Sequence, residues 1–420
     1  MKRFDCGSIM PGCDHVFTGR GDQSVLDQVL AHAAAEHGLI APPLSFIELV
    51  LTHTRPFALT RIPGGAVGRT PDERPAHAEL STISTNPFRS NPVLGGKARP
   101  PRRPQLIPNQ PGRSHETYRH ECLLYAGSQG FLDAVVPFVR DGLARSEPVM
   151  IAVAEPRQVA LRTALGANAE RVMFADMTDL GHKPALIIPA WREFTERYSG
   201  TGRPVRGVGE PIWANRQPAE IAEAQLREAL LNVAVSPDVP LWLLCPYDTS
   251  TLDDEVLTEA HRSHPVVFET AAYRGSAQYG GAAHVEEFFG TPLPEPGTTA
   301  TSIAFDPDGH SHVQGFLRVA SHAGLPLARA VRLAAAIDEI ACAAYQETAY
   351  AGLRTWTERG ALICEVADPG EVRNPMIGRG AGPDDLRPRS RALWLANELA
   401  DLVQVRSGLT GTTTRILCWL

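Results

Sequence analysis

Apolar and polar positions change their spacing along the chain, and these changes divide it into folded segments. Between residues 115 and 270, short apolar runs alternate with stretches of helical periodicity, which is typical of a largely parallel sheet with crossover helices. The strands predicted there are ECLLYA, VMIAVA, VMFAD, VRGVGE and LWLLCP. Beyond residue 300 the pattern predicts helices at 312–323, 327–349 and 391–406, with strands at 361–367 and in TTRILCWL. This last segment is predicted to be an α+β sandwich with helices on one face of a mixed sheet.

The start of the chain predicts a small α+β unit followed by a linker. The stretch SVLDQVLAHAAAEHG has Val25, Val29 and Ala33 at helical spacing, with Gly38 as a stop signal. Residues 53–114 are dominated by Pro, Gly, Arg, Ser and Asn, so they bury too little apolar area to offset the entropy lost on ordering. We therefore predict an α/β multidomain chain. Its parts are an N-terminal unit at 1–52, a flexible Pro/Arg-rich linker at 53–114, a middle domain at 115–270 and a C-terminal domain at 300–420.

Composition limits the classes of function. The net charge of -7 argues against a large nucleic-acid footprint. The sequence contains no run of eighteen apolar residues, so no membrane span is expected, and the start lacks the apolar core of a secretory signal. The 7 cysteines have irregular spacing, which does not indicate a disulfide framework. We expect a cytoplasmic protein.

The C-terminal segment carries four ordered blocks. RLAAAIDEIACAAYQET is a predicted helix that contains Glu339, and an Asp-Pro-Gly turn at 368–370 follows the next strand, before ALWLANELADLVQVRSG and GTTTR. This order resembles the GHKL (histidine-kinase-like) ATPase fold, above all the anti-sigma-factor type of serine kinase and its actinobacterial relatives. The resemblance implies that ATP or ADP binds, with Glu339 as base and Asp368 on the adenine amino group. It also places Gly370, Arg391 and Thr412 at the nucleotide.

Two positions depart from that family. The family's metal-holding asparagine aligns with Ala343, which has no ligand atom, and its glycine-rich helix entry aligns with Arg389-Ser390-Arg391-Ala392-Leu393. Phosphoryl transfer depends on positioning and charge neutralisation, so the lost metal ligand removes a main contribution. We expect weak binding of ATP or ADP with little dependence on Mg²⁺, inefficient kinase chemistry and a vestigial Glu339. The plainer alternatives are a solvated or salt-bridged Glu339 and an ordinary turn at 368–370.

The middle segment carries the blocks HECLLYAGSQGF, GEPIW, EALLN and CPYD. They are similar to the MEDS sensory domain over residues 118–268. The resemblance implies a RecA- or KaiC-like parallel sheet without a working phosphate loop, and the turn after the first strand indeed lacks that motif. Polar groups at the carboxyl ends of the strands should line the site of such a sheet. The residues predicted to bind an unknown small ligand are His120, Glu210, Glu228 and Asp248.

Three further candidates in this segment have competing interpretations. Core packing is the favoured interpretation of Trp213 and Tyr247. Glu223 and Glu228 are five residues apart on one predicted helix, so they diverge and only one of them is expected to face the site. Ligand sensing fits these residues better than catalysis, because no nucleophile stands beside the carboxylates in the sequence.

The N-terminal unit carries a candidate metal site. Cys6, Cys13, His32 and His37 offer two thiolates and two imidazoles, a set that suits tetrahedral zinc. The unit resembles a small bacterial domain of unknown function with the same Cys, Cys, His, His order. Histidines five apart on a straight helix diverge by about 140°, so both bind one ion only if the helix ends early or unwinds. A redox pair of cysteines, or buried cysteines with surface histidines, remain alternatives, and His15 is a spare ligand.

The resemblances together predict a signal-transduction regulator. In it, a ligand-sensing MEDS-like domain controls a degenerate anti-sigma-type GHKL domain, which acts in transcription control by switching partners. The expected partner is a sigma factor or its antagonist protein, and a homodimer is compatible with the sequence. One alternative is an active ATP-dependent serine protein kinase. The other is a scaffold that binds no nucleotide.

The composition of the linker predicts its response to protease. Limited trypsin should cut first between Arg55 and Arg113, because an extended, exposed backbone enters a protease site readily. Gel electrophoresis with mass spectrometry should then show a stable fragment of residues 115–420. If the basic sites in this range remain uncut while sites elsewhere are cleaved, the domain division is wrong.

Overall fold

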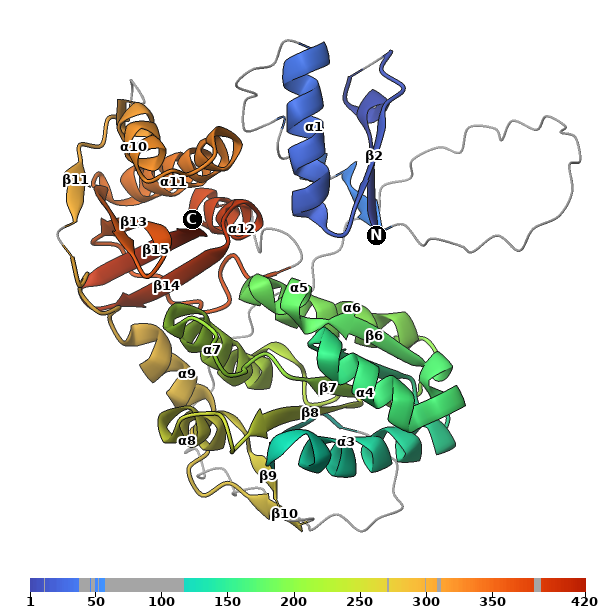
Figure 1. Cartoon of the computed structure of the whole chain (residues 1–420). Helices are drawn as coiled ribbons and strands as arrows, with labels where there is room; N and C mark the ends of the chain where they lie inside the picture. Colours follow the sequence, from blue (N-terminus) through green and yellow to red (C-terminus); the bar gives the residue numbers. More distant parts are fainter. Residues whose placement is uncertain are drawn as a thin grey trace, which may run out of the picture.

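The computed structural model describes residues 1–10, 12–37, 46, 50–51, 53–56, 117–269, 272–298, 300–307, 311–380 and 387–420. Figure 1 shows three folded units, with the N-terminal unit beside the C-terminal domain and the middle domain below both. The predicted linker, apart from residues 53–56, lies outside the described residues, as does Gly38. Among the described helices, none combines the length and apolar character needed to cross a membrane.

In its described residues, the N-terminal unit is a three-stranded antiparallel sheet against which helix α1 (Asp22–Glu36) packs. The strands have the order β2-β1-β3 and are β1 (Lys2–Asp5), β2 (Val16–Gly19) and β3 (Arg55–Pro56). Helix α1 buries Val25, Leu26 and Val29 against them. Because β3 pairs with β1, this unit continues to Pro56, beyond the predicted boundary at residue 52.

The middle domain contains a seven-stranded sheet with the order β10-β9-β4-β8-β7-β5-β6. The pairings are parallel except for β9 with β10, so the predicted α/β fold with a mostly parallel sheet is confirmed. Every residue of β5 and of β7 is buried, which explains their continuous apolar runs. The strands are β4 (Arg119–Tyr125), β5 (Val149–Val153), β6 (Val172–Asp176), β7 (Val205–Gly209), β8 (Leu241–Asp248), β9 (Val266–Glu269) and β10 (Ala272–Gly275).

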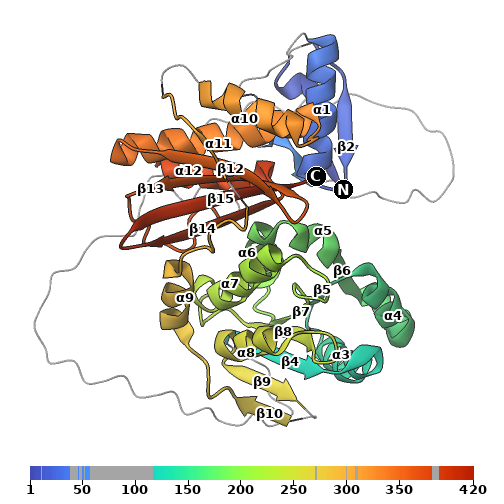
Figure 2. The ribbon, with the colours of Figure 1, turned by 60° about the vertical axis from the view of Figure 1, so that its left-hand side comes forward.

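Helices cover both faces of this sheet (Figure 2). Neighbouring residues of β4 point to opposite faces, so Leu123 belongs to one apolar cluster and Cys122 to another. The first cluster contains side chains of α3 (Gly127–Ala144) and α4 (Glu155–Leu165). The second contains side chains of α6 (Ile187–Ser199), α7 (Pro218–Ala234) and α8 (Asp254–Ser263), with α5 (Met177–His182) near β5 and β6.

The C-terminal domain is a five-stranded sheet with three helices on one face. Its order is β11-β12-β13-β15-β14. The strands are β11 (Thr301–Ile303), β12 (Gly352–Glu358), β13 (Ala361–Asp368), β14 (Leu402–Gly408) and β15 (Gly411–Trp419). The helices are α10 (Ser311–His322), α11 (Leu327–Thr348) and α12 (Pro388–Leu399). The helices match the expected sandwich, but the sheet was predicted as mixed and all of its described pairings are antiparallel.

The helix predicted at 391–406 is too long. The helix ends at Leu399, and residues 402–408 form β14, which pairs with β15 along its whole length. The segment LVQVRSG has valines at alternate positions, and this period-two signal was overlooked beside the helical run before it. Strand β12 was also missed.

Helix α9 (Gly281–Gly290), which the sequence did not predict, connects the two larger domains. It contacts α7 and α8 of the middle domain and β14 of the C-terminal sheet. Both views show it between these domains (Figures 1 and 2). The second face of the C-terminal sheet carries Trp356, Ile363 and Leu417, against which Ala219 of α7 packs. The C-terminal sheet is therefore covered by its own helices on one face and contacted by the middle domain on the other.

Gly207 of β7 gives a direct test of the packing under α6. A Cβ added there would lie 2.5 Å from Cζ3 of Trp191 and 2.8 Å from Cδ1 of Leu243, both fully buried. We expect Gly207→Ala to lower the free energy of unfolding by about 1–3 kcal/mol, as overpacking does. Gly200→Ala is the control, since no atom lies within 4 Å of its added Cβ. Urea unfolding should leave the control within about 0.5 kcal/mol of the parent protein; equal values for both variants would contradict this packing.

Candidate functional site

The four predicted metal ligands of the N-terminal unit come together. Their ligand atoms all lie within 4.8 Å of one another. Sγ of Cys13 is 3.2 Å from Nε2 of His32, Sγ of Cys6 is 3.7 Å from Nε2 of His37, and the two Nε2 atoms are 3.1 Å apart. The edges of a tetrahedral zinc site with nitrogen and sulfur ligands are about 3.3–3.8 Å long. This cluster is compatible with zinc.

The end of α1 explains how two histidines five residues apart meet. The helix ends at Glu36, and His37 has φ -115° and ψ 0°, outside the helical range. The ring of His15 lies 4.3 Å from that of His32, which makes it a near neighbour of the cluster. Without a metal, burial and the proximity of Cys13 raise the pKa of Cys6 to about 11. Burial and the charges of His15 and His37 lower the pKa of His32.

In the middle domain, two of the four predicted ligand residues meet at the carboxyl ends of the strands. Glu210 follows β7 and Asp248 ends β8. The hydroxyl of Tyr125, at the end of β4, donates to Oε1 of Glu210 at 2.6 Å. Nε of Arg157 is 2.8 Å from Oε2 of Glu210, and its Nη2 is 3.4 Å from Oδ2 of Asp248. The sequence did not single out Tyr125, although it lies in the block HECLLYAGSQGF, or Arg157, which lies in no recognisable motif.

The charges at this edge do not favour a phosphate ligand. Burial raises the pKa of Glu210 to about 7, although Arg157 opposes the shift. The backbone N–H of Gly127, in the turn where a phosphate loop would lie, donates to Oδ1 of Asp248 at 3.1 Å. A carboxylate therefore already uses a donor that a phosphate would need. The edge offers one carboxyl group that titrates near neutral pH and a second that is held ionised by hydrogen bonds from Ser250 and Gly127.

His120 and Glu228 do not lie at that edge but in a second, fully buried cluster. His120 is the second residue of β4, far from its carboxyl end. Its Nε2 is 3.2 Å from Oε2 of Glu228, and Nε2 of His264 is 3.1 Å from the same oxygen. Sγ of Cys245 is 3.3 Å from Nε2 of His120. The prediction of one site at the strand ends is therefore wrong for His120 and Glu228, which meet between the sheet and helices α7 and α8.

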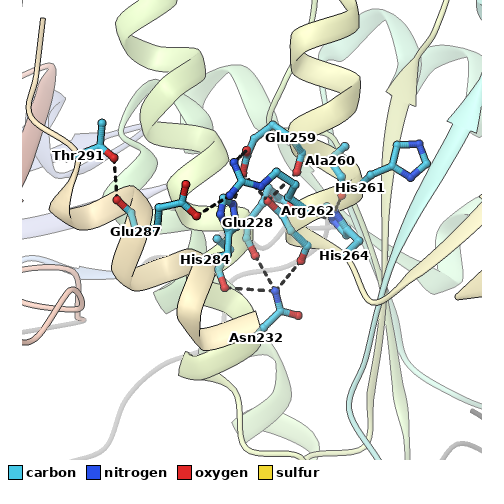
Figure 3. Close-up of polar contacts among 12 residues, drawn as sticks. Glu228, Asn232, Glu259, Ala260, His261, Arg262, His264, His284, Glu287 and Thr291 are labelled. Carbon is cyan, nitrogen blue, oxygen red and sulfur yellow. Dashed lines mark hydrogen bonds and ion pairs between the residues drawn. The ribbon is translucent and has the colours of Figure 1, made fainter. Parts of the chain in front are cut away.

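Cys245 and His264 were missed as members of this cluster. Cys245 lies in the block CPYD and His264 directly precedes Pro265, so a signal for Cys245 at least was present in the sequence. Although burial opposes ionisation, the proximity of His120 and His264 lowers the pKa of Glu228 to about 2. Figure 3 shows Glu228, His264 and Asn232 together, with the Asn232 amide directed at backbone oxygens. Tyr247 is a buried packing neighbour, with its ring 5.7 Å from that of His264.

Glu223 faces away from this cluster and binds the C-terminal domain. Its Oε1 accepts from Arg379 at 2.8 Å and from Arg227 at 3.0 Å, and its Oε2 from Arg406 at 3.2 Å. All four side chains are buried. Burial alone would raise the pKa of Glu223, but the arginines lower it to about 2. Trp213 is partly buried and lies under Arg216, whose guanidinium is 4.5 Å from the ring centre.

A cavity of about 520 Å³ adjoins this interface. The middle domain lines it from α7, α8 and α9, and the C-terminal sheet lines it from the opposite side. Its polar groups include Arg262, which is paired with Glu287 at 2.6 Å, and Arg406 of the buried network. Figure 3 shows three of the lining residues, Arg262 with Glu287 and His284. A ligand in this cavity would contact both domains.

Three residues predicted to lie at the nucleotide, Asp368, Gly370 and Thr412, come together in the structure. The carboxylate of Asp368, however, is already paired with the side chain of Arg389. Asp368 and Thr412 are opposite each other in the pairing of β13 with β15, and Thr412 donates to the carbonyl of Gly370 at 2.6 Å. Arg389 makes a bidentate ion pair with the Asp368 carboxylate, at 2.8 and 2.9 Å. Its Nε donates to Glu347 of α11 at 2.6 Å. The sequence predicted that the Arg389 side chain would obstruct the phosphates of a nucleotide. In the structure it instead pairs with Asp368, the carboxylate predicted to bind the adenine amino group.

The other predicted nucleotide residues lie on the neighbouring helices. Glu339 is half-buried on α11, and Ala343, one turn later, is buried at 3% exposure in the apolar core. Arg391 is on the exposed side of α12. A Cβ on Gly370 would lie 2.8 Å from both Asp368 and Thr348, so the glycine is required by its own neighbours and not only by a base. Residues 381–386, between β13 and α12, lie outside the described residues.

Comparison with protein families covers the first two units. Residues 119–265 match the MEDS family, the methanogen/methylotroph DcmR sensory domain. Residues 1–54 match a family of proteins of unknown function, DUF1059. The resemblances predicted for these two units are confirmed. Neither match extends into residues 300–420, where the GHKL resemblance stays a prediction. A comparison with curated proteins gives no match. The MEDS match indicates a sensory, regulatory role for the middle domain.

The N-terminal cluster predicts one structural zinc ion. Full-length protein from zinc-supplemented medium should lose one metal equivalent on Cys13→Ala, and hydrogen exchange should show that α1 loses protection, because metal binding supplies folding energy in so small a unit. Cys364→Ala is the control: this cysteine is buried in β13 of the C-terminal domain, which contributes no residue to either cluster. If Cys13→Ala changes neither metal content nor exchange, the structural-metal interpretation fails. In that case, a disulfide between Cys6 and Cys13 that forms when the parent protein is treated with an oxidant would favour the redox alternative.

Proposed function

We propose that this protein is a signal-transduction regulator whose MEDS-like domain senses a small ligand and controls a C-terminal domain of the anti-sigma GHKL type. That C-terminal domain binds a sigma factor or its antagonist protein. The MEDS match supports the sensory half. The ordered blocks around Glu339, Asp368 and Thr412 support the other half, together with the packing of three helices on one face of a sheet.

The observation that carries this proposal is the position of helix α7. Within two turns it contributes Glu228 to the buried cluster of the MEDS-like domain and Glu223 to the ion network with Arg379 and Arg406. Gln404 of β14 also donates to the carbonyl of Ala219, at 3.2 Å. A ligand that shifts α7 therefore changes the contacts of the C-terminal domain directly.

The energetics of the network suit a switch with distinct states. Removing one partner from a buried ion pair costs about 3–5 kcal/mol, because the remaining charge is left unpaired away from water. Small displacements of α7 are therefore resisted, whereas a larger one must separate Glu223 from Arg379 and Arg406 together. The adjoining cavity of about 520 Å³ is lined by both domains and by Arg406 of this network, so a small ligand bound there would lie beside the contact.

The nucleotide residues support partner binding rather than kinase activity. The Asp368 carboxylate is engaged by Arg389, and Ala343 supplies no ligand for Mg²⁺. An ATP-dependent serine kinase would need both groups available. The scaffold alternative shares the blocked site but predicts no coupling between the MEDS-like and C-terminal domains.

Partner binding by defined variants tests the proposal. The full-length protein should bind a sigma factor or its antagonist from the same source, and isothermal titration should show the same affinity with and without Mg-ATP. Glu223→Gln, which keeps the shape but removes the charge at the interface, should change that affinity at least tenfold. Glu193→Gln is the control, because Glu193 forms an exposed pair with Arg197 on α6.

Three outcomes would contradict the proposal in different ways. Phosphorylation of the antagonist by the purified protein at a rate on the order of 1 s⁻¹ would establish the kinase alternative. Equal affinity of the Glu223→Gln and Glu193→Gln variants for the partner protein would leave only the scaffold alternative, in which the domains are not coupled. Failure to bind either protein would remove the assignment to the anti-sigma type.

A further inference from the structure

The histidines of the buried cluster have fixed hydrogen-bonding roles. The Asn232 amide nitrogen donates to three backbone carbonyls, those of Glu228, Ala229 and Ser263, at 3.3, 3.2 and 2.7 Å. This fixes the amide orientation, so its Oδ1 is the atom 3.1 Å from Nδ1 of His120. Because Oδ1 only accepts, Nδ1 of His120 carries a proton.

The second histidine is held in the same form. Nδ1 of His264 is 2.8 Å from the carbonyl oxygen of Ala260, which also only accepts, so it too carries a proton. When the two imidazoles are neutral, Nε2 of each therefore presents a lone pair. Both lone pairs point at Oε2 of Glu228, and Sγ of Cys245 lies beside Nε2 of His120. Four electron-rich atoms therefore converge, and all of them lie within 4.8 Å of one another.

Hydrogen bonds alone do not give each of these four atoms a suitable partner. If both Nε2 atoms were protonated, two imidazolium rings would lie with centres 4.2 Å apart in a site that no solvent reaches. Two adjacent cations in such a site repel each other and lack solvation, which opposes that arrangement. A protonated Glu228 would donate to only one of the two histidines. One divalent cation would satisfy all four atoms at once.

Charge and geometry both fit such a cation. A thiolate, a carboxylate and two neutral imidazoles with one M²⁺ ion give a net charge of zero, which is the favourable state for a buried site. The contacts of 3.1, 3.2 and 3.3 Å between ligand atoms are close to the roughly 3.3–3.8 Å edges of a tetrahedral zinc site. Asn232 and the carbonyl of Ala260 are the outer hydrogen-bond partners that orient metal-bound histidines. The four atoms have the donor set and the supporting contacts of a metal centre.

We propose that His120, Glu228, Cys245 and His264 bind a divalent first-row transition-metal ion, with zinc as the best match to two imidazoles, one thiolate and one carboxylate. This site is separate from the N-terminal cysteine–histidine cluster and from the strand-end groups around Glu210. It does not depend on the proposed partner or on nucleotide binding.

The test uses the full-length protein from zinc-supplemented medium, analysed for metal per chain. Cys245→Ser should lower the zinc content by one equivalent, whereas Cys122→Ser should not change it. Cys122 is the matched control, because it is equally buried and lies opposite Cys245 in the pairing of β4 with β8. Cys13→Ala should still retain the equivalent bound in the middle domain, so the two sites are counted separately.

Cobalt gives a second measurement that does not depend on the serine variant being folded. Co²⁺ added to metal-free Cys13→Ala protein should give the thiolate-to-cobalt charge-transfer band of a single sulfur ligand. Cys245→His in the same background should keep the bound cobalt but lose that band. Asn232→Leu should weaken zinc binding about 10–100-fold, as loss of an outer partner does. Metal-free protein, or a zinc content that Cys245→Ser leaves unchanged, overturns the proposal and leaves a network held by protons.

Discussion

The arrangement of the two larger domains depends on one buried carboxylate. Glu223 is the shared acceptor of Arg227 from its own helix and of Arg379 and Arg406 from the C-terminal domain. Burial and the charge of Arg379 lower the pKa of Arg227 well below its usual range, which shows how strongly the cations repel one another here. Without the carboxylate, three guanidinium groups would face each other away from water. The closed interface therefore requires α7 to hold Glu223 in place.

Much of the fold followed from periodicity, and the failures have physical causes. The parallel sheet of the middle domain was predictable because strands buried on both faces give continuous apolar runs, as in β5 and β7. Residues 402–408 were mistaken for helix because the periodic run of α12 leads directly into them, while their pairing with β15 is a long-range interaction. Helix α9 was missed because it is short and lies between glycines, and its apolar residues are covered only when two domains meet.

The candidate sites were also only partly predictable from the sequence, because most of their contacts are between residues far apart in the chain. Cys6, Cys13, His32 and His37 could be grouped from the sequence because the unit is small and each residue type is rare there. His120 and Glu228 were singled out, but 108 positions separate them, and only the packing of α7 on β4 shows that they meet with Cys245 and His264. The role of Arg389 was also hidden, because an ion pair with Asp368 depends on where α12 begins relative to β13.

The covering of the C-terminal sheet on both sides has a consequence for competition. A protein that recognises the face bearing Trp356 and Leu417 meets a surface already occupied by α7 and α9. Because the occupant belongs to the same chain, its effective concentration is on the order of millimolar, far above that of most cellular proteins. Binding at this face is thus a contest between an intramolecular and an intermolecular contact. An outside protein succeeds only if it binds much more tightly or if the middle domain first releases the face.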